Sequence, residues 1–219
     1  MKEKPILPPA LPEGLETAER GEELAAMAAA RQEPLARWHF CGLDLCGETL
    51  REMRFEQCLF EGCRFTGADL RAASFVDCRL KHCELSAVRA GEVYFLRCQL
   101  QGVKALAASL ADSRLVHLEL DECALADVNF SGASMEQVCF QGCDLSAASL
   151  SDCRHKGLAV ARCRLVRTNF FKTSLAGLDF SDSRLEGIVV SDTAAELKGA
   201  TVSLEQAAEL ARLLGVIVR

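Results

Sequence analysis

The sequence has few aromatic residues and no long hydrophobic run. Only 6% of its 219 residues are aromatic, with one Trp and one Tyr, which is unusual for a conventional core of this size. No stretch approaches the roughly 18 consecutive apolar residues that a membrane-spanning helix needs. The N-terminal stretch MKEKPILPPALPEG has no apolar segment of the kind found in signal peptides. These absences argue against a transmembrane or secreted protein and predict a cytoplasmic location.

The sequence also lacks a positive charge excess and a recognisable catalytic motif. Lys and Arg number 25 against 31 Asp and Glu, a net charge of −6, whereas nucleic-acid binding favours basic residues. There is no phosphate-binding loop, no dinucleotide-binding glycine motif, no HExxH and no GxSxG. The four His residues are scattered along the chain. We therefore expect a protein that is not an enzyme, holds no cofactor or metal, and does not bind nucleic acid directly.

A large apolar residue recurs at every fifth position from Phe40 to Val190, without an insertion or deletion. Only Ala90, Ala105 and His155 depart from this rule. The stretch CRFTGADLRAASFVDCRL, residues 63–80, has its large residues at Phe65, Leu70, Phe75 and Leu80. A smaller residue stands two positions before most of the large ones, as Cys63, Ala68, Ala73 and Cys78 do here. Neither the helical period of 3.6 nor the strand period of 2 explains this spacing.

A period of five predicts a β-solenoid with square coils. Each five-residue segment contributes two inward side chains and then turns a corner, so four segments make one coil of about 20 residues. Successive coils pair about 4.8 Å apart, and each covers the core of its neighbour. Residues 38–192 then form about eight coils in a rod roughly 37 Å long.

The stretches FTGADLRAASF, ALADVNFSGASM and VRTNFFKTSLAGLDF resemble the pentapeptide-repeat family, whose motif is A(D/N)LXX. The resemblance covers residues 38–192. It implies an all-β fold, a right-handed quadrilateral β-helix.

Twelve cysteines raise the possibility of disulfides or a zinc site. Nine of them occupy the small inward position, namely Cys58, Cys63, Cys78, Cys83, Cys98, Cys123, Cys143, Cys153 and Cys163. A cysteine there acts as a small buried hydrophobe, and parallel side chains suit a disulfide badly. We predict free packed thiols, with redox bridging as the alternative. Cys41, Cys46 and Cys139 lie outside this position and are expected to be the more reactive thiols.

We call the five-residue repeat from Phe40 to Val190 the frame, and residues 1–37 lie outside it. KPILPPALP predicts an extended lead, and residues 13–31, rich in Ala, Glu and Leu, predict a helix that Pro34 should end. We expect this helix to cover the first coil; binding a partner is the alternative.

Residues 193–219 predict a helix followed by a short strand. Ser203 and Gln206 form a capping box, and Gly215 is a natural helix stop. The expected helix stripe is Leu204, Ala207, Ala208, Ala211 and Leu214, and the expected strand is Val216, Ile217 and Val218. A helix this short is marginal alone, so it should pack on the last coil, on a second subunit, or on both.

This tail is similar to that of Qnr-type quinolone-resistance proteins and their mycobacterial relatives, in which it joins two solenoids. The resemblance implies a homodimer through the C-terminus, with a monomeric cap as the alternative. It also implies a DNA mimic that binds a type II topoisomerase, DNA gyrase or topoisomerase IV, and modulates it or protects it from quinolones. The alternative is a scaffolding repeat protein with another cytoplasmic protein partner. Qnr-type proteins carry loops that interrupt the frame, and this sequence has none, so loop-dependent protection is not implied.

The candidate partner-binding residues are acidic side chains at outward positions: Glu52, Glu92, Asp112, Glu119, Asp121, Glu122, Asp127, Glu136, Asp144, Asp152 and Asp192. Those at 52, 92, 112, 152 and 192 are separated by multiples of 20 and should line one corner of the rod. A basic stretch at residues 154–172 interrupts the negative surface. The alternative is a solvated surface that only keeps the rod soluble.

Overall fold

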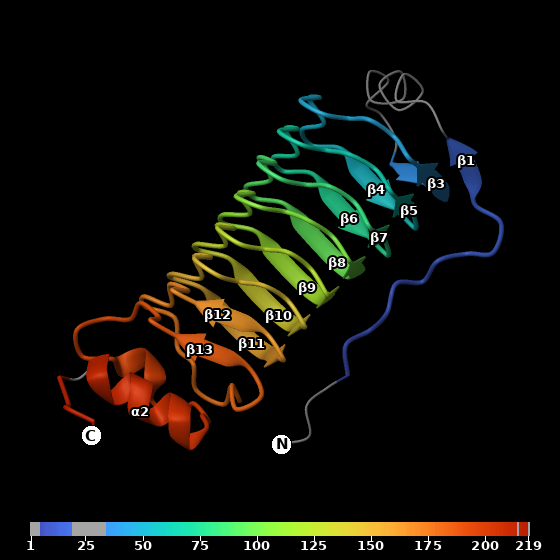
Figure 1. The fold of residues 1–219 in the computed structure, drawn as a ribbon. Helices are drawn as coiled ribbons and strands as arrows, with labels where there is room; N and C mark the ends of the chain where they lie inside the picture. Colours follow the sequence, from blue (N-terminus) through green and yellow to red (C-terminus); the bar gives the residue numbers. More distant parts are fainter. Residues whose placement is uncertain (1–4, 19–33, 214, 219) are drawn as a thin grey trace.

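The computed structural model describes residues 5–18, 34–213 and 215–218, and these form a β-solenoid closed by a C-terminal helix (Figure 1). The short strands are β1 (Glu16–Ala18), β2 (Leu35–Ala36), β3 (Trp38–Cys41), β4 (Arg54–Glu56), β5 (Leu59–Glu61), β6 (Ser74–Val76), β7 (Arg79–Lys81), β12 (Arg164–Val166) and β13 (Arg184–Glu186). The long strands are β8 (Tyr94–Gln101), β9 (Arg114–Asp121), β10 (Ser134–Gln141) and β11 (Arg154–Ala161). A 3-10 turn, η1 (Ala195–Leu197), precedes helix α2 (Leu204–Leu213). None of the helices in these ranges is long and apolar enough to cross a membrane.

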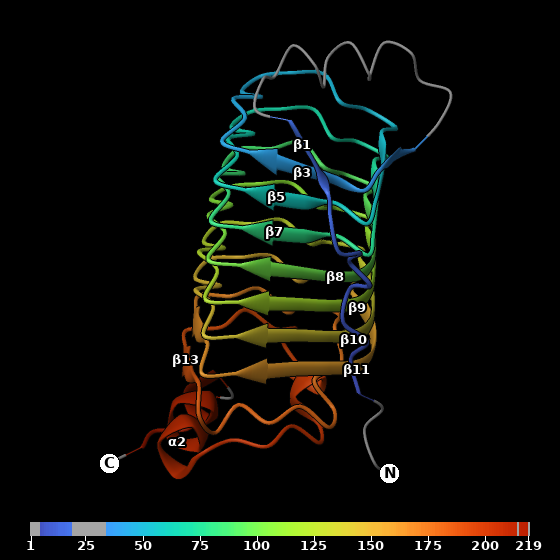
Figure 2. The ribbon, with the colours of Figure 1, turned by 90° about the vertical axis from the view of Figure 1, so that its right-hand side faces the viewer.

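Every coil pairs with the next in parallel, at a register of 20 residues. Phe40 is opposite Phe60 and Phe75 is opposite Phe95. The rod has four sides, and β2, β4, β6 and the first halves of β8–β11 lie on the first. The second side carries β3, β5, β7 and the second halves of β8–β11 (Figure 2). The third carries the bridges of the Asp44–Arg64 series and the fourth those of the Thr49–Asp69 series. The predicted solenoid of about eight coils is confirmed.

The corners between the sides use left-handed backbone. The residue two after the large apolar one has positive φ at most corners, for example Glu92 at 60° and Asp112 at 56°, but not at Asp182 or Asp192. Most residues adopt this conformation only at a cost, whereas Gly, Asn and Asp adopt it more readily. The corner residue turns the chain by its backbone, so its side chain is free to point outward.

The core is filled by the large residues of the frame. Phe75 is 1% exposed, and its ring stacks between Phe55 and Phe95 at centroid distances of 5.0 and 4.8 Å. Ala90 and Ala105 are buried as well, although they are smaller than the rule requires. His155 is only half-buried, and its Nε2 bonds the backbone carbonyl of Ser174 where the first-side ladder ends.

The nine inward cysteines are buried and free, as predicted. Their thiols share one geometry: each donates to the carbonyl of the residue 23 positions earlier, as Cys58 does to Leu35 at 3.2 Å. Thr168 occupies the same kind of position, and its hydroxyl donates to the Leu145 carbonyl at 2.9 Å. The position takes a small side chain, Ala68 and Ala73 included, and where that side chain has a donor, as in Cys, Ser or Thr, the donor reaches back to the preceding coil.

Burial shields these thiols and raises the pKa of several of them, whereas the neighbouring thiols Cys83 and Cys143 lower the pKa of Cys63 and Cys123. Burial raises the pKa of Cys153 to about 11, and the neighbouring Cys78 thiol, together with burial, raises the pKa of Cys58 well above its usual range. Because all nine inward thiols are buried, reagents reach them poorly, and they should react slowly near neutral pH. Cys46, by contrast, is exposed, and Cys41 and Cys139 are half-buried.

The predicted helix over residues 13–31 is wrong where the structure describes it. Residues 16–18 form β1, which pairs in parallel with β3, and Glu16 N–H donates to the Arg37 carbonyl at 3.1 Å. The outer edge of β3 offers unpaired backbone groups, and pairing with them outweighs the helix propensity of this segment. Residues 19–31 lie outside the described residues.

The predicted strand at residues 216–218 forms no ladder within the single chain, and its pairing with a second copy stays a prediction. The helix before them ends as expected at Gly215, which has φ of 77°. Val216 N–H then donates to the Ala211 carbonyl at 3.1 Å, as in a Schellman motif. A strand needs a neighbour, and in a single chain the end of α2 supplies none.

Phe75→Ala is expected to lower the free energy of unfolding by about 3–5 kcal/mol, because it leaves a cavity between two stacked rings. Phe171→Ala is the control: the Phe171 side chain is 38% exposed and should lose about 1 kcal/mol or less. Urea unfolding of the two variants measures both values. Equal losses would contradict the assigned frame.

Thiol titration at pH 8 is expected to find fast reaction only among Cys41, Cys46 and Cys139, because the other nine thiols are buried. In denatured protein prepared without reductant, all twelve cysteines should react. Mapped disulfides between inward cysteines of neighbouring coils would contradict the packing role.

Candidate protein-interaction surfaces

One corner of the rod, between the fourth and first sides, carries a column of acidic residues. We call this the acidic corner; it comprises Glu52, Glu92, Asp112, Asp152 and Asp192. All five are exposed, as predicted. The Asp112 carboxylate lies over Gly132, the next position in the column, where a Cβ would collide with it. The acidic corner therefore forms a line of carboxylates along the rod, interrupted by Ala72, Gly132 and Lys172.

The other predicted acidic residues do not join this line. Glu136 lies on the first side, Glu119 and Asp121 on the second, and Asp144 on the third. Glu122 and Asp127 occupy two other corners, between the second and third sides and between the third and fourth sides. The structure thus spreads the predicted set around the whole rod.

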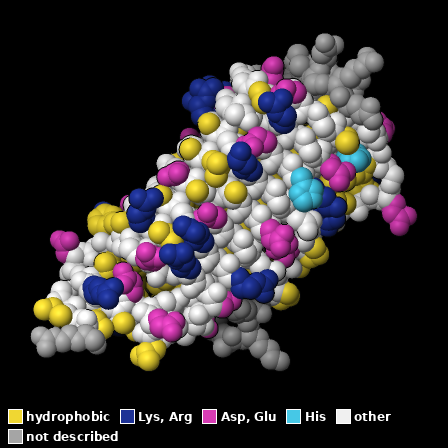
Figure 3. All heavy atoms as spheres, viewed as in Figure 1, with side chains coloured by type: hydrophobic (Ala, Val, Ile, Leu, Met, Phe, Trp, Pro, Cys, Tyr) yellow, Lys and Arg dark blue, Asp and Glu magenta, His cyan; other side chains and the backbone are white. Residues whose placement is uncertain are grey.

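Ion pairs between neighbouring coils offset much of the negative charge. On the third side Arg64 pairs with Asp44 at 2.7 Å and Lys104 with Glu84 at 3.2 Å. On the fourth side the buried Asp69 pairs with Arg89 of the next coil at 3.7 Å. It also accepts two bonds from Arg71 of its own coil, which lower its pKa to about 2. Figure 3 shows basic and acidic side chains interspersed over one face of the rod. The surface is a patchwork of both signs.

Two buried polar side chains bond backbone groups of the last coil that a further coil would otherwise pair with. Gln206 donates its side-chain amide to the carbonyls of Phe180 and Ser183 at 2.8 and 2.6 Å. It also completes the predicted capping box with Ser203, since Ser203 N–H donates to Gln206 Oε1 at 2.8 Å. Sequence reasoning identified the cap but not the contact with the last coil.

Glu196 is the second of these side chains, and sequence reasoning missed it. Its carboxylate accepts Lys172 N–H at 2.9 Å and the Ser191 hydroxyl at 2.8 Å. Burial would raise the pKa of Glu196, but the surrounding N–H and hydroxyl donors outweigh burial and lower it. Glu196 lies after the last repeat, so the five-residue spacing could not indicate that its side chain is buried.

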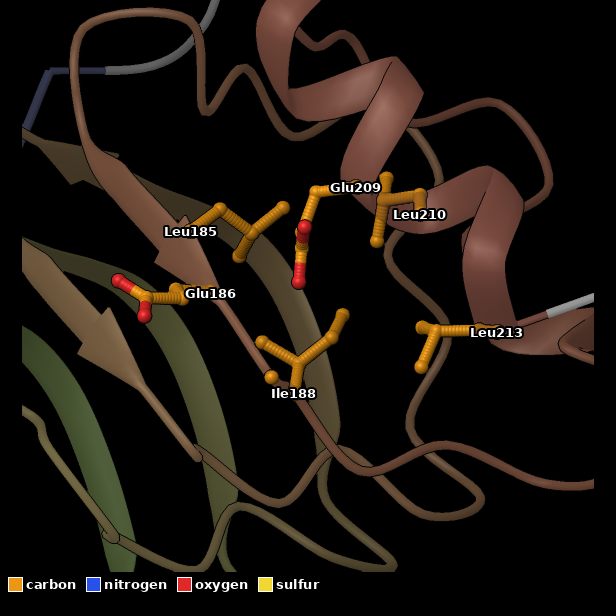
Figure 4. Close-up of a pocket in the computed structure, with 7 residues that line it drawn as sticks. Leu185, Glu186, Ile188, Glu209, Leu210 and Leu213 are labelled. Atoms are coloured by element: carbon orange, nitrogen blue, oxygen red, sulfur yellow. The ribbon is translucent and has the colours of Figure 1, made fainter. Parts of the chain in front are cut away.

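The face of α2 that packs on the rod differs from the predicted stripe. Leu210 and Leu213 face Leu185 and Ile188 of the last coil, and Glu209 reaches between them (Figure 4). The crevice among them has room for about one water molecule, so it is no ligand site. Leu204, in contrast, is 89% exposed.

The predicted dimerisation residues therefore lie mostly on open surface at the end of the rod. Ala207 is exposed, and Ala208 and Ala211 are half-buried. Beyond the helix, Val216 is 52%, Ile217 83% and Val218 39% exposed. Leu214 lies outside the described residues. We call the described members of this set, Leu204, Ala207, Ala208, Ala211, Val216, Ile217 and Val218, the C-terminal apolar cluster.

Comparisons with known proteins place the repeats in a family. The family model described as "Pentapeptide repeat region" matches residues 73–150, and the model "Pentapeptide repeats (8 copies)" matches residues 50–86. No curated protein matches the chain.

Solved structures of other repeat proteins are similar at low identity. HetL, a pentapeptide repeat protein involved in heterocyst differentiation regulation in the cyanobacterium Nostoc sp. strain PCC 7120, is 18% identical with a TM-score of 0.49; the match covers 84% of this chain and 95% of HetL. QnrB1, a plasmid-mediated fluoroquinolone resistance protein, is 19% identical with a TM-score of 0.45; the match covers 92% of this chain and 95% of QnrB1. The two models identify pentapeptide repeats in residues 50–86 and 73–150, and the same five-residue spacing continues on both sides of these residues.

Proposed function

We propose that this protein is a non-enzymatic binding protein that pairs end to end into a homodimer and presents the sides of its rod to a protein partner. The observation that carries the proposal is the C-terminal apolar cluster. Five of the eight large apolar side chains that the described residues expose belong to residues 204–218. They gather at one end of the rod (Figure 1), where a two-fold axis would bring each cluster against its own copy.

Pairing would also satisfy the backbone at residues 216–218. These residues have a strand-like apolar composition and make no ladder in the single chain. Alignment with the same residues of a second copy would give them a partner and cover Ile217. The result is a doubled rod with identical sides on both halves.

The patchwork of charges favours a scaffold over a strict DNA mimic, because mimicry needs a continuous negative face. A topoisomerase ligand is the second candidate, and the acidic corner is the observation in its favour. Glu92 and Asp112 stand on successive coils with their side chains exposed, and no ion pair within the described residues engages them. Carboxylates in such a line could occupy a basic groove that otherwise takes phosphates.

Leu204→Asp with Ile217→Asp is expected to convert a dimer into a folded monomer, because it places charge in the paired apolar surface. Light scattering gives the mass, and circular dichroism checks the fold. Val189→Asp, at a side chain that is 47% exposed outside the cluster, is the control and should stay dimeric. A parent chain that is monomeric at all concentrations would contradict the assembly.

Reversing the acidic corner with Glu92→Lys, Asp112→Lys and Asp152→Lys is expected to reduce any effect on DNA gyrase supercoiling by about tenfold or more. The assay is titrated with and without a quinolone. A matched control carries the same charge change on dispersed positions: Glu122→Lys, Asp127→Lys and Glu136→Lys. Equal behaviour of the two triple variants, or a parent with no effect on gyrase, would remove the mimicry candidate and leave the scaffold.

A further inference from the structure

An extended N-terminal segment lies along the corner between the first and second sides. We call residues 5–12 the strap; they follow the rod past several coils (Figure 2). Three side chains of that corner hold the strap backbone. Leu7 N–H donates to His117 Nδ1 at 3.2 Å, Ala10 N–H donates to Asp77 Oδ1 at 3.1 Å, and Gln57 Nε2 donates to the Ala10 carbonyl at 3.1 Å.

The spacing of these contacts matches an extended proline-rich chain. From Leu7 to Ala10 is three residues, about 9 Å in a polyproline helix. From His117 to Asp77 is two coils, about 10 Å. The residues between are Pro8 and Pro9, which have no N–H to leave unbonded. Both N–H groups that this four-residue stretch possesses are therefore bound.

The corner is built for this occupant. Asp77 is 7% exposed, and Arg97 donates to its two oxygens at 2.7 and 2.6 Å. Burial would raise the pKa of Asp77, but the bonds from Arg97 and from Ala10 N–H lower it, so the carboxylate stays charged. The carboxylate is thus fixed in place as an acceptor for a passing backbone N–H.

The side chains beside this corner change character where the strap passes. The outward residues just before the corner on the first side are Val76, Leu96 and Val116, all half-buried. The same position one coil earlier is Glu56 and one coil later is Glu136, both exposed. Apolar residues therefore occupy this outward column in the three coils between Glu56 and Glu136. These side chains point away from the core of the rod, so the packing of the core does not require them to be apolar.

We propose that this corner is a peptide-binding track for extended, proline-containing polypeptide segments, which the strap occupies in cis. Gln57, Asp77 and His117 read the peptide backbone at an i, i+3 spacing, and the apolar column receives its side chains. Prolines between the two bound N–H groups are favoured, because they hold the segment extended and carry no unmatched donor. The partner is thus a polypeptide with a Leu-Pro-Pro-Ala-like stretch. This inference does not rest on the dimer or on gyrase.

The test uses the full chain with Leu7→Pro and Ala10→Pro, which removes both strap donors and keeps the strap extended. Fluorescence anisotropy measures binding of a labelled synthetic peptide with the parent sequence of residues 4–14. The double variant should bind this peptide about tenfold more tightly than the parent chain, whose track is occupied. A peptide that carries the same two prolines should not bind.

Two variants locate the site. In the Leu7→Pro, Ala10→Pro chain, His117→Ala should abolish peptide binding. Gln137→Ala, one coil further along the same corner, should leave binding unchanged. A double variant that fails to bind the parent peptide overturns the proposal, and so does binding that survives His117→Ala.

Discussion

The inward side chain at every fifth residue is the constraint on which the rest of the structure depends. It puts residues 20 apart in register, so that Phe40 meets Phe60 and Phe75 meets Phe95. The same register carries the backbone ladder and the thiol and hydroxyl bonds that reach back to the preceding coil. Corners, sides and surface columns all follow from it, because a residue's place in the frame decides whether it faces core or solvent.

The sequence alone predicts the features that recur in every coil, but few of the contacts that occur at only one place in the chain. The coils, the buried cysteines and the acidic corner follow from counting by five. The two ends do not: β1 forms because β3 has an open edge, and Gln206 and Glu196 are buried because the last coil leaves carbonyl and N–H groups without a ninth coil. The strap was predicted to be extended, but its contacts with Asp77 and His117 depend on three-dimensional neighbours that no sequence period encodes.

Different parts of the rod surface have different roles. Paired charges on the third and fourth sides join neighbouring coils. The features that could engage a partner stand apart from these pairs: the C-terminal apolar cluster at one end, the acidic corner, and the strap corner. All three lie on a scaffold whose stability comes from neighbouring coils only, so each can change without altering the others.

The central claim is that the coil of 20 residues is the unit of this structure, and deletion tests it most directly. Removal of residues 123–142 joins Glu122 to Cys143 in the original frame, whereas removal of Asp127 alone puts every later inward residue of the chain out of step. Urea unfolding should show that the chain lacking a whole coil unfolds cooperatively near the midpoint of the parent. The chain lacking one residue should be far less stable. The opposite order of stability would contradict the account.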